Sequence, residues 1–206
     1  DKISNFLLPI AEKLSKNRYL SAIRDGYIAI MPLVITASLF TLINSVLIGE
    51  GNYLDQWFGT PFTDFAKLGS VISSASMSIM TILLVFTTAK ALATHYKMDT
   101  SITGATALVC FLCLTPFVSD ATIGEYVTTY YLGAAAMFTG FISALIAVEL
   151  LRFLMGFKAL IIKMPDSVPS GIARSLNSII PVALTVIIFG VVRILTDALG
   201  APLNDL

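Results

Sequence analysis

The chain has 206 residues, of which 56% are hydrophobic and only 13% are charged, and its mean hydropathy is +0.86. A soluble domain carries roughly 25% charged residues, so this composition excludes a water-soluble globular protein and indicates an integral membrane protein. Lys and Arg together number 13 and balance 13 Asp and Glu residues. No basic patch with interleaved aromatic residues occurs, so nucleic acid is excluded as a partner.

Residues 1–22 are predicted to form an amphipathic helix. Its apolar residues recur at helical spacing and its charged residues lie off that face. The apolar set is Ile3, Phe6, Leu7, Ile10 and Leu14. Such a helix can lie in the membrane interface with its apolar face among the lipids. It can also pack on the rest of the protein, and the two interpretations are compatible.

Five apolar segments follow and define a predicted transmembrane domain over residues 23–206. They span about residues 26–48, 71–93, 102–118, 131–153 and 178–199. Each is near the roughly 20 residues that a membrane-spanning helix needs, although the third is short and contains Pro116. The segments are continuously apolar and lack the alternation of barrel strands. We therefore predict an all-α integral membrane protein in which five transmembrane helices follow the amphipathic helix.

The placement of Lys and Arg predicts the orientation of these helices. Basic residues precede the first segment and fill the second–third and fourth–fifth connections. The connecting residues are Lys90 and Lys97, and Arg152, Lys158, Lys163 and Arg174. The other two connections, about residues 49–70 and 119–130, hold only Lys67 and are otherwise acidic. Because cytoplasmic loops carry the excess of basic residues, we expect the N-terminus in the cytoplasm.

Small residues are concentrated in two of the segments. Four serines and an alanine lie between residues 73 and 78, and glycine and alanine recur between residues 133 and 144. Small side chains let helix backbones approach closely in a membrane. They indicate either the interface of a homodimer or packing within the chain, and composition does not separate the two.

The sequence contains no recognisable catalytic constellation. His95 is the single histidine and lies in a predicted cytoplasmic loop, where solvent exposure is the favoured interpretation. Cys110 and Cys113 form a CxxC pair, which fits a redox or metal site less well than packing on one helix face. Charged residues of the segments are predicted to pair, Glu149 with Arg152 and Arg193 with Asp197. We therefore expect no metal, no cofactor and no enzyme activity.

The stretch KMPDSVPSGIARSLNSIIP, residues 163–181, separates the last two segments. Two prolines in it oppose a continuous helix, because proline lacks an N–H and restricts the preceding residue. We predict a shaped loop in which Asp166, Ser167 and Arg174 position the fifth helix or border a pathway between the helices. Ordinary capping and loop hydrogen bonds explain these residues equally well.

This stretch resembles the loop before the fifth transmembrane helix of a known family. The family comprises the EIIC permeases of the bacterial phosphoenolpyruvate-dependent sugar phosphotransferase system, in the lactose/cellobiose/chitobiose branch. The stretch LSKNRYLSAIRDGYIAIMPLVITASLFTLI, residues 14–43, resembles the amphipathic segment and first helix of the same permeases. The resemblance covers essentially the whole chain but only about half of the family's length.

The resemblance implies a multi-pass protein of the bacterial cytoplasmic membrane that acts as a homodimer. It implies transport of a β-linked disaccharide such as cellobiose, chitobiose or lactose, with phosphorylation by the partner protein EIIB, which EIIA charges. In the family the first five helices form the dimerising domain, and the second half carries most of the sugar site. This chain is therefore expected to be a transporter subunit. The alternative is a truncated membrane scaffold or dimerisation domain without transport activity of its own.

Overall fold

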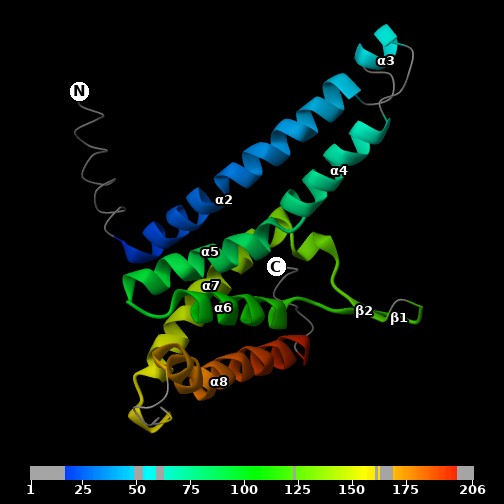
Figure 1. Ribbon diagram of the computed structural model, residues 1–206. Helices are drawn as coiled ribbons and strands as arrows, with labels where there is room; N and C mark the ends of the chain where they lie inside the picture. Colours follow the sequence, from blue (N-terminus) through cyan, green and yellow to red (C-terminus); the bar gives the residue numbers. More distant parts are fainter. Residues whose placement is uncertain are drawn as a thin grey trace, which may run out of the picture.

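The computed structural model describes residues 17–48, 53–58, 63–122, 124–160, 162 and 169–198. The chain is mostly helical in these ranges (Figure 1). The α-helices are α2 (Arg18–Ile43), α3 (Tyr53–Phe58), α4 (Thr63–Met77), α5 (Met80–His95), α6 (Thr100–Leu114), α7 (Met137–Met155) and α8 (Ser170–Ala198). A π-helical turn, Asn44–Ile48, continues α2, and short 3-10 helices flank α7.

The long helices run back and forth between two ends of the molecule. At one end, on the left of Figure 1, α2, α6 and α8 begin, and α5 and α7 finish there. At the opposite end lie a small hairpin and the C-terminal end of α8. The outer part of α2 packs along α4, and the two extend away from the remaining helices as an arm (Figure 1).

Each of the five predicted apolar segments coincides with helical structure. Within the described residues, three helical stretches are long and apolar enough to cross a membrane: Arg18–Ile48, Ala134–Met155 and Gly171–Ala198. A fourth candidate is the pair Lys67–Met77 and Met80–His95, which is bent by 42° at its break. The remaining segment corresponds to α6, an apolar helix of 15 residues.

Several helix ends differ from the predicted ones, and proline accounts for two of them. Helix α6 ends at Leu114, earlier than residue 118, because Pro116 lacks an N–H and Thr115 before it is extended, with φ −81° and ψ 133°. Helix α8 begins at Ser170, well before residue 178, and the Ala173 N–H donates to the Pro169 carbonyl at 3.0 Å. Proline is tolerated at a helix start, so the polar stretch after Pro169 is helical.

The predicted helix at residues 1–22 lies mostly outside the described residues. Helix α2 begins at Arg18, so residues 18–22 are its first turns. The side chain of Asn17 caps it by accepting a hydrogen bond from the Tyr19 N–H at 3.0 Å.

The core lies where α2, α5, α6 and α7 meet, and close approach of these helices depends on small residues. A Cβ added at Gly26 of α2 would lie 2.4 Å from Thr88 Oγ1 and 2.9 Å from its Cα. One added at Gly140 of α7 would lie 2.6 Å from Thr81 Cγ2. Ala144 and Ala147 are also buried. The small residues of α7 therefore serve packing within the chain, as one of the two interpretations predicted.

Other local predictions are confirmed by the packing. Cys110 is buried in the core and Cys113 packs against it, and both are unbonded thiols. Arg193 pairs with Asp197 at 2.7 Å, and Arg152 pairs with Glu149 at 2.8 Å.

The connection between α6 and α7 contains a hairpin that the all-helical prediction did not include. Strands β1 (Val118–Asp120) and β2 (Gly124–Tyr126) pair antiparallel, with Val118 opposite Tyr126. The Asp120 carboxylate accepts from the Thr122 N–H at 2.7 Å and fixes the turn. The hairpin is exposed and extends away from the helices (Figure 1).

Candidate functional site

Of the three residues singled out by sequence, Arg174 lies in the part of the chain that the structure describes, and it belongs to α8. Asp166 and Ser167 fall outside the described residues, so their roles stay predictions. Arg174 lies near the beginning of α8, is exposed, and lines a cavity together with residues of α6 and α7.

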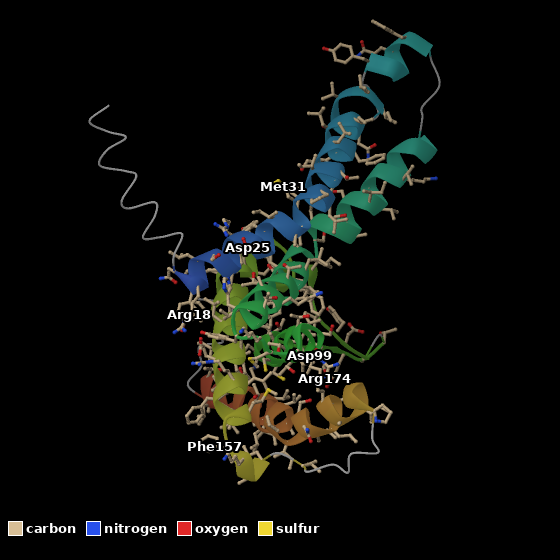
Figure 2. All side chains as sticks on the ribbon, turned by 60° about the vertical axis from the view of Figure 1, so that its left-hand side comes forward. Arg18, Asp25, Met31, Asp99, Phe157 and Arg174 are labelled. Carbon is tan, nitrogen blue, oxygen red and sulfur yellow. The ribbon has the colours of Figure 1, made fainter. Side chains whose placement is uncertain are left out.

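The cavity lies where the α5–α6 connection, the end of α7 and the beginning of α8 meet. Its volume is about 470 Å³, which is within the range of roughly 300–1,000 Å³ typical of small-molecule sites. Its lining residues are Lys97, Met98, Asp99, Ile102, Thr103, Arg152, Met155, Gly156, Arg174, Asn177 and Ser178. Figure 2 shows Asp99 and Arg174 on the adjacent starts of α6 and α8.

The charges of this cavity are mainly positive. Lys97, Arg152 and Arg174 contribute three cations from three different elements, against the one carboxylate of Asp99. That carboxylate already caps α6, because Asp99 Oδ1 accepts from the N–H groups of Ser101 and Ile102, both at 3.0 Å. Arg152 also pairs with the Glu149 carboxylate beside the cavity at 2.8 Å, so three cations of the lining face two carboxylates in and next to it.

Lys97 has an unusual backbone conformation for its residue type. Its φ is +57°, in the left-handed region, which costs a residue with a Cβ about 1–2 kcal/mol. The Lys97 N–H donates to the Thr94 carbonyl at 3.1 Å, and the Met98 N–H donates to the Ala93 carbonyl at 3.0 Å. This is the Schellman pattern that ends a helix, in which glycine usually takes the left-handed position. A lysine there places a charged side chain at the cavity.

Next to the cavity, the Glu149 carboxylate joins three elements. Its Oε1 accepts from the Tyr19 hydroxyl of α2 at 2.9 Å and from the Tyr96 hydroxyl after α5. Its Oε2 accepts from Arg152 Nε at 3.0 Å. These bonds connect the start of α2, the α5–α6 connection and the end of α7.

The Tyr96 ring contacts two guanidinium groups. Arg152 Cζ is 4.5 Å from the ring centroid and Arg18 Cζ is 5.3 Å from it, so both make cation–π contacts. Burial raises the pKa of the Tyr96 phenol, and the hydrogen bond to Glu149 raises it further. The phenol is therefore a neutral donor throughout the physiological pH range.

The geometry supports binding of an anion. Three cations can bind an anion, and Asn177 supplies an amide at the cavity wall. His95 is the exposed last residue of α5, as its predicted loop position suggested.

Sequence reasoning found the Glu149–Arg152 pair but missed Tyr19, Tyr96 and Asn177. The tyrosines are 130 and 53 residues from Glu149, so no local spacing indicated their contact. The left-handed backbone of Lys97 was also missed. The one available signal was that no glycine or asparagine follows the end of α5, so another residue had to take the left-handed position.

Comparison with known proteins gives a consistent family. The family model described as "Phosphotransferase system, EIIC" matches residues 24–204. The oligo-beta-mannoside-specific EIIC component of Bacillus subtilis is 34% identical over 95% of this chain and 44% of its own length. The cellobiose-specific EIIC component of Geobacillus stearothermophilus is 32% identical over 93% of this chain and 44% of its own length.

A solved structure agrees with these relatives. The crystal structure of the transporter ChbC, the IIC component of the N,N'-diacetylchitobiose-specific phosphotransferase system, matches with a TM-score of 0.79 and 31% identity. The match covers 96% of this chain and 47% of that chain. This chain thus spans about half the length of the proteins it resembles.

Proposed function

Because this chain belongs to the EIIC family of the sugar phosphotransferase system, we propose that it forms the N-terminal half of a permease for a β-linked disaccharide. The observation that carries this proposal is the match to a IIC transporter over 96% of the chain. The relatives are named for oligo-β-mannosides, cellobiose and N,N'-diacetylchitobiose. Their shared chemistry favours a β-linked sugar, and transport places the protein in the bacterial cytoplasmic membrane.

We propose five membrane crossings with the N-terminus in the cytoplasm. In this topology the bent pair α4–α5 is one crossing and the short α6 is another. The distribution of charge supports it, because Arg18, Lys97, Arg152 and Arg174 all lie near the end where α2 begins. The hairpin at the other end carries Asp120 and Glu125. Excess basic charge is typical of the cytoplasmic side.

Phosphoryl transfer belongs to the partner proteins in this proposal. EIIB, charged by EIIA, would donate the phosphoryl group to sugar held by the intact permease, and the basic end of the helices would face EIIB. The permease itself performs no covalent step. The cavity at the start of α8 supports this arrangement, since its side chains can bind an anion.

We propose that Asp166 and Ser167 of the loop before α8, together with Arg174 of α8, set the position of this helix or border the pathway. The prolines of this loop restrict the chain just before α8 begins. Replacing both by Pro165→Ala and Pro169→Ala in the full permease should slow sugar uptake at unchanged expression. Unchanged uptake would count against a shaping role for the loop.

A homodimer is proposed through the arm of α2 and α4. The small residues of α7 are used inside the chain, whereas Ser70, Ser74 and Ala75 of α4 are exposed. Small exposed residues permit close contact with a second copy in the membrane. Cross-linking through Ser74→Cys should give a covalent dimer, with an exposed position of α8, Ile194→Cys, as the control.

The decisive experiment is uptake by proteoliposomes containing the permease at its native length together with EIIB and EIIA. Cellobiose, N,N'-diacetylchitobiose and lactose would be supplied outside, and the phosphorylated sugar measured inside. Accumulation of one phosphorylated sugar supports the permease. If the native product is this chain alone and it dimerises without binding any of these sugars, the scaffold alternative replaces it.

A further inference from the structure

The cavity at the start of α8 combines cationic, hydroxyl-accepting and apolar surfaces. Its cations come from the α5–α6 connection, from α7 and from α8, so they surround the space from different sides. Glu149 already pairs with Arg152. Within the part of the chain that the structure describes, the Lys97 ammonium has no hydrogen-bond or ion-pair partner. An anion in the cavity would supply one.

The backbone at Lys97 is a second, independent observation. Glycine would occupy this left-handed position without strain, yet lysine occupies it. Strained positions concentrate at binding sites, where the side chain has a use. The side chain placed by this strain lines the cavity.

Asn177 adds a hydrogen-bond acceptor to which a ligand could donate. Its Oδ1 atom is buried and has no hydrogen-bond partner among the described residues, and Asn177 lines the cavity. An unpaired buried acceptor is costly. Its backbone carbonyl also lacks the usual helical donor, because that donor would be the N–H that Pro181 does not have. A hydroxyl-bearing ligand could donate to the amide oxygen.

The remaining wall is apolar and lies at one end of the membrane-crossing helices. Met98, Ile102 and Met155 form it. Basic pockets between helices at this depth are typical sites for phosphate headgroups of lipids.

We propose that this cavity binds a phosphate ester of a polyol, with Lys97, Arg152 and Arg174 on the phosphate and Asn177 on a hydroxyl. Two sources carry this chemistry. One is the phosphoglycerol headgroup of an anionic phospholipid, which the apolar wall and the position of the cavity favour. The other is a soluble sugar or glycerol phosphate.

The test measures ligand-induced thermal stabilisation of the purified protein at its native length. The probes are dioctanoyl phosphatidylglycerol, dioctanoyl phosphatidylcholine, glycerol 3-phosphate and inorganic phosphate. A ligand that binds only the folded state raises Tm, and the rise increases with the ratio of the ligand concentration to Kd. The phosphatidylglycerol probe should raise Tm, and the phosphatidylcholine probe, with the same chains and no net charge, should raise it much less.

The informative variant is Lys97→Gly, because it removes the charge and the backbone strain together. Without ligand its Tm should equal or exceed that of the unmodified protein. Its affinity for phosphatidylglycerol should fall about tenfold, as expected for loss of one charge-assisted contact. Asn177→Ala should lower the affinity for phosphatidylglycerol more than the affinity for inorganic phosphate, which has no polyol.

The matched control is Lys158→Ala, which removes an exposed cation at the same end but outside the cavity. It should leave the affinity unchanged. Binding of glycerol 3-phosphate without binding of phosphatidylglycerol would support the site and assign it to a soluble ester. If neither probe binds, or if Lys97→Gly and Lys158→Ala weaken binding equally, the site is overturned. None of these readouts uses sugar transport, so failure of the permease proposal would be seen separately.

Discussion

Glu149 is a charged residue inside an apolar helix, and donors from other elements compensate its charge. A carboxylate near the end of a membrane helix is costly without partners. Here Tyr19, Tyr96 and Arg152 donate to it. Two of these donors come from α2 and the α5–α6 connection, so one side chain fixes three elements at the end that we propose to be cytoplasmic.

Replacing this residue by Glu149→Gln should destabilise the protein. The amide keeps the size of the side chain but loses the charge. Its NH₂ group cannot accept a hydrogen bond from Tyr19, Tyr96 or Arg152, so at least one of these donors loses its acceptor. We expect a loss of about 1–3 kcal/mol in the free energy of unfolding, the usual cost of unpairing a buried polar group. The measurement is Tm in detergent or nanodiscs.

The matched control is Asp25→Asn. Among the described residues, Asp25 pairs with the adjacent and exposed Arg24, at 2.8 Å. Exposed pairs contribute little, roughly 0–1 kcal/mol. Equal effects of the two variants would show that the Glu149 contacts do not connect the helices.

Among the helices, α6 shows how a short element is completed inside a membrane protein. It has 15 residues and ends before Pro116, so its last carbonyls have no helical donor. Arg193 of α8 donates from Nη1 to the Leu114 carbonyl at 2.8 Å and from Nε to Asp197 at 2.7 Å. A cation at a helix C-terminus is favourable for the helix dipole as well. The predicted Arg193–Asp197 pair thus has a further purpose, to hold the guanidinium at α6.

Replacing the arginine by Arg193→Met should remove the charge-assisted hydrogen bond to the Leu114 carbonyl. We expect a loss of about 1–3 kcal/mol, because a hydrogen bond from a charged donor contributes roughly this much. Thermal unfolding measures the loss. Asp197→Asn, which leaves the bond to Leu114 in place, should cost clearly less. If both variants are equally unstable, the stabilisation comes from the Arg193–Asp197 ion pair and not from the hydrogen bond to the Leu114 carbonyl.

The crossing of α2 and α5 gives a prediction about packing. Gly26→Ala would place a methyl group against the Thr88 backbone, so the helices would have to separate. Overpacking of this kind lowers the free energy of unfolding by roughly 1–3 kcal/mol. In Gly190→Ala the new Cβ meets nothing within 4 Å, and removing an interior glycine should stabilise α8 by about 0.5–1 kcal/mol. Opposite shifts of Tm are expected, and a fall in both would contradict the close crossing.

For the whole molecule, apolar segment length predicted the helices well, because it is a local property of the sequence. All five segments are helical. The places where prediction failed depend on context. The pattern did not show that Pro169 begins a helix while Pro116 ends one, nor that the short hairpin would form around Asp120.

The candidate site was harder to predict, because its residues come from distant parts of the chain. Arg174 was identified from its loop, but Lys97, Arg152 and Asn177 join it only through the packing of α6, α7 and α8. Lys97 lines the cavity because its backbone is left-handed at the end of α5. The pattern of apolar and charged residues did not indicate this backbone conformation. Sequence patterns of charge alone indicated only a basic cytoplasmic side.

The large-scale arrangement predicts which parts of the chain lie on opposite sides of the membrane. Lys158 and Thr122 are both exposed, but they follow α7 and β1 at opposite ends of the helices. With the N-terminus in the cytoplasm, Thr122→Cys should react with a membrane-impermeant maleimide in intact cells. Lys158→Cys should react only in inverted membrane vesicles, because its side faces the cytoplasm.

The unmodified protein supplies the background for this experiment. Cys110 is buried and Cys113 half-buried, so both should be labelled slowly from either side. Reaction of both introduced cysteines from the same side would contradict an odd number of crossings between them. A reversed pattern would preserve the helix arrangement but invert the orientation, and it would move the basic cavity of Lys97 and Arg174 away from EIIB. Side-specific labelling therefore tests the orientation on which the proposed contact with EIIB depends.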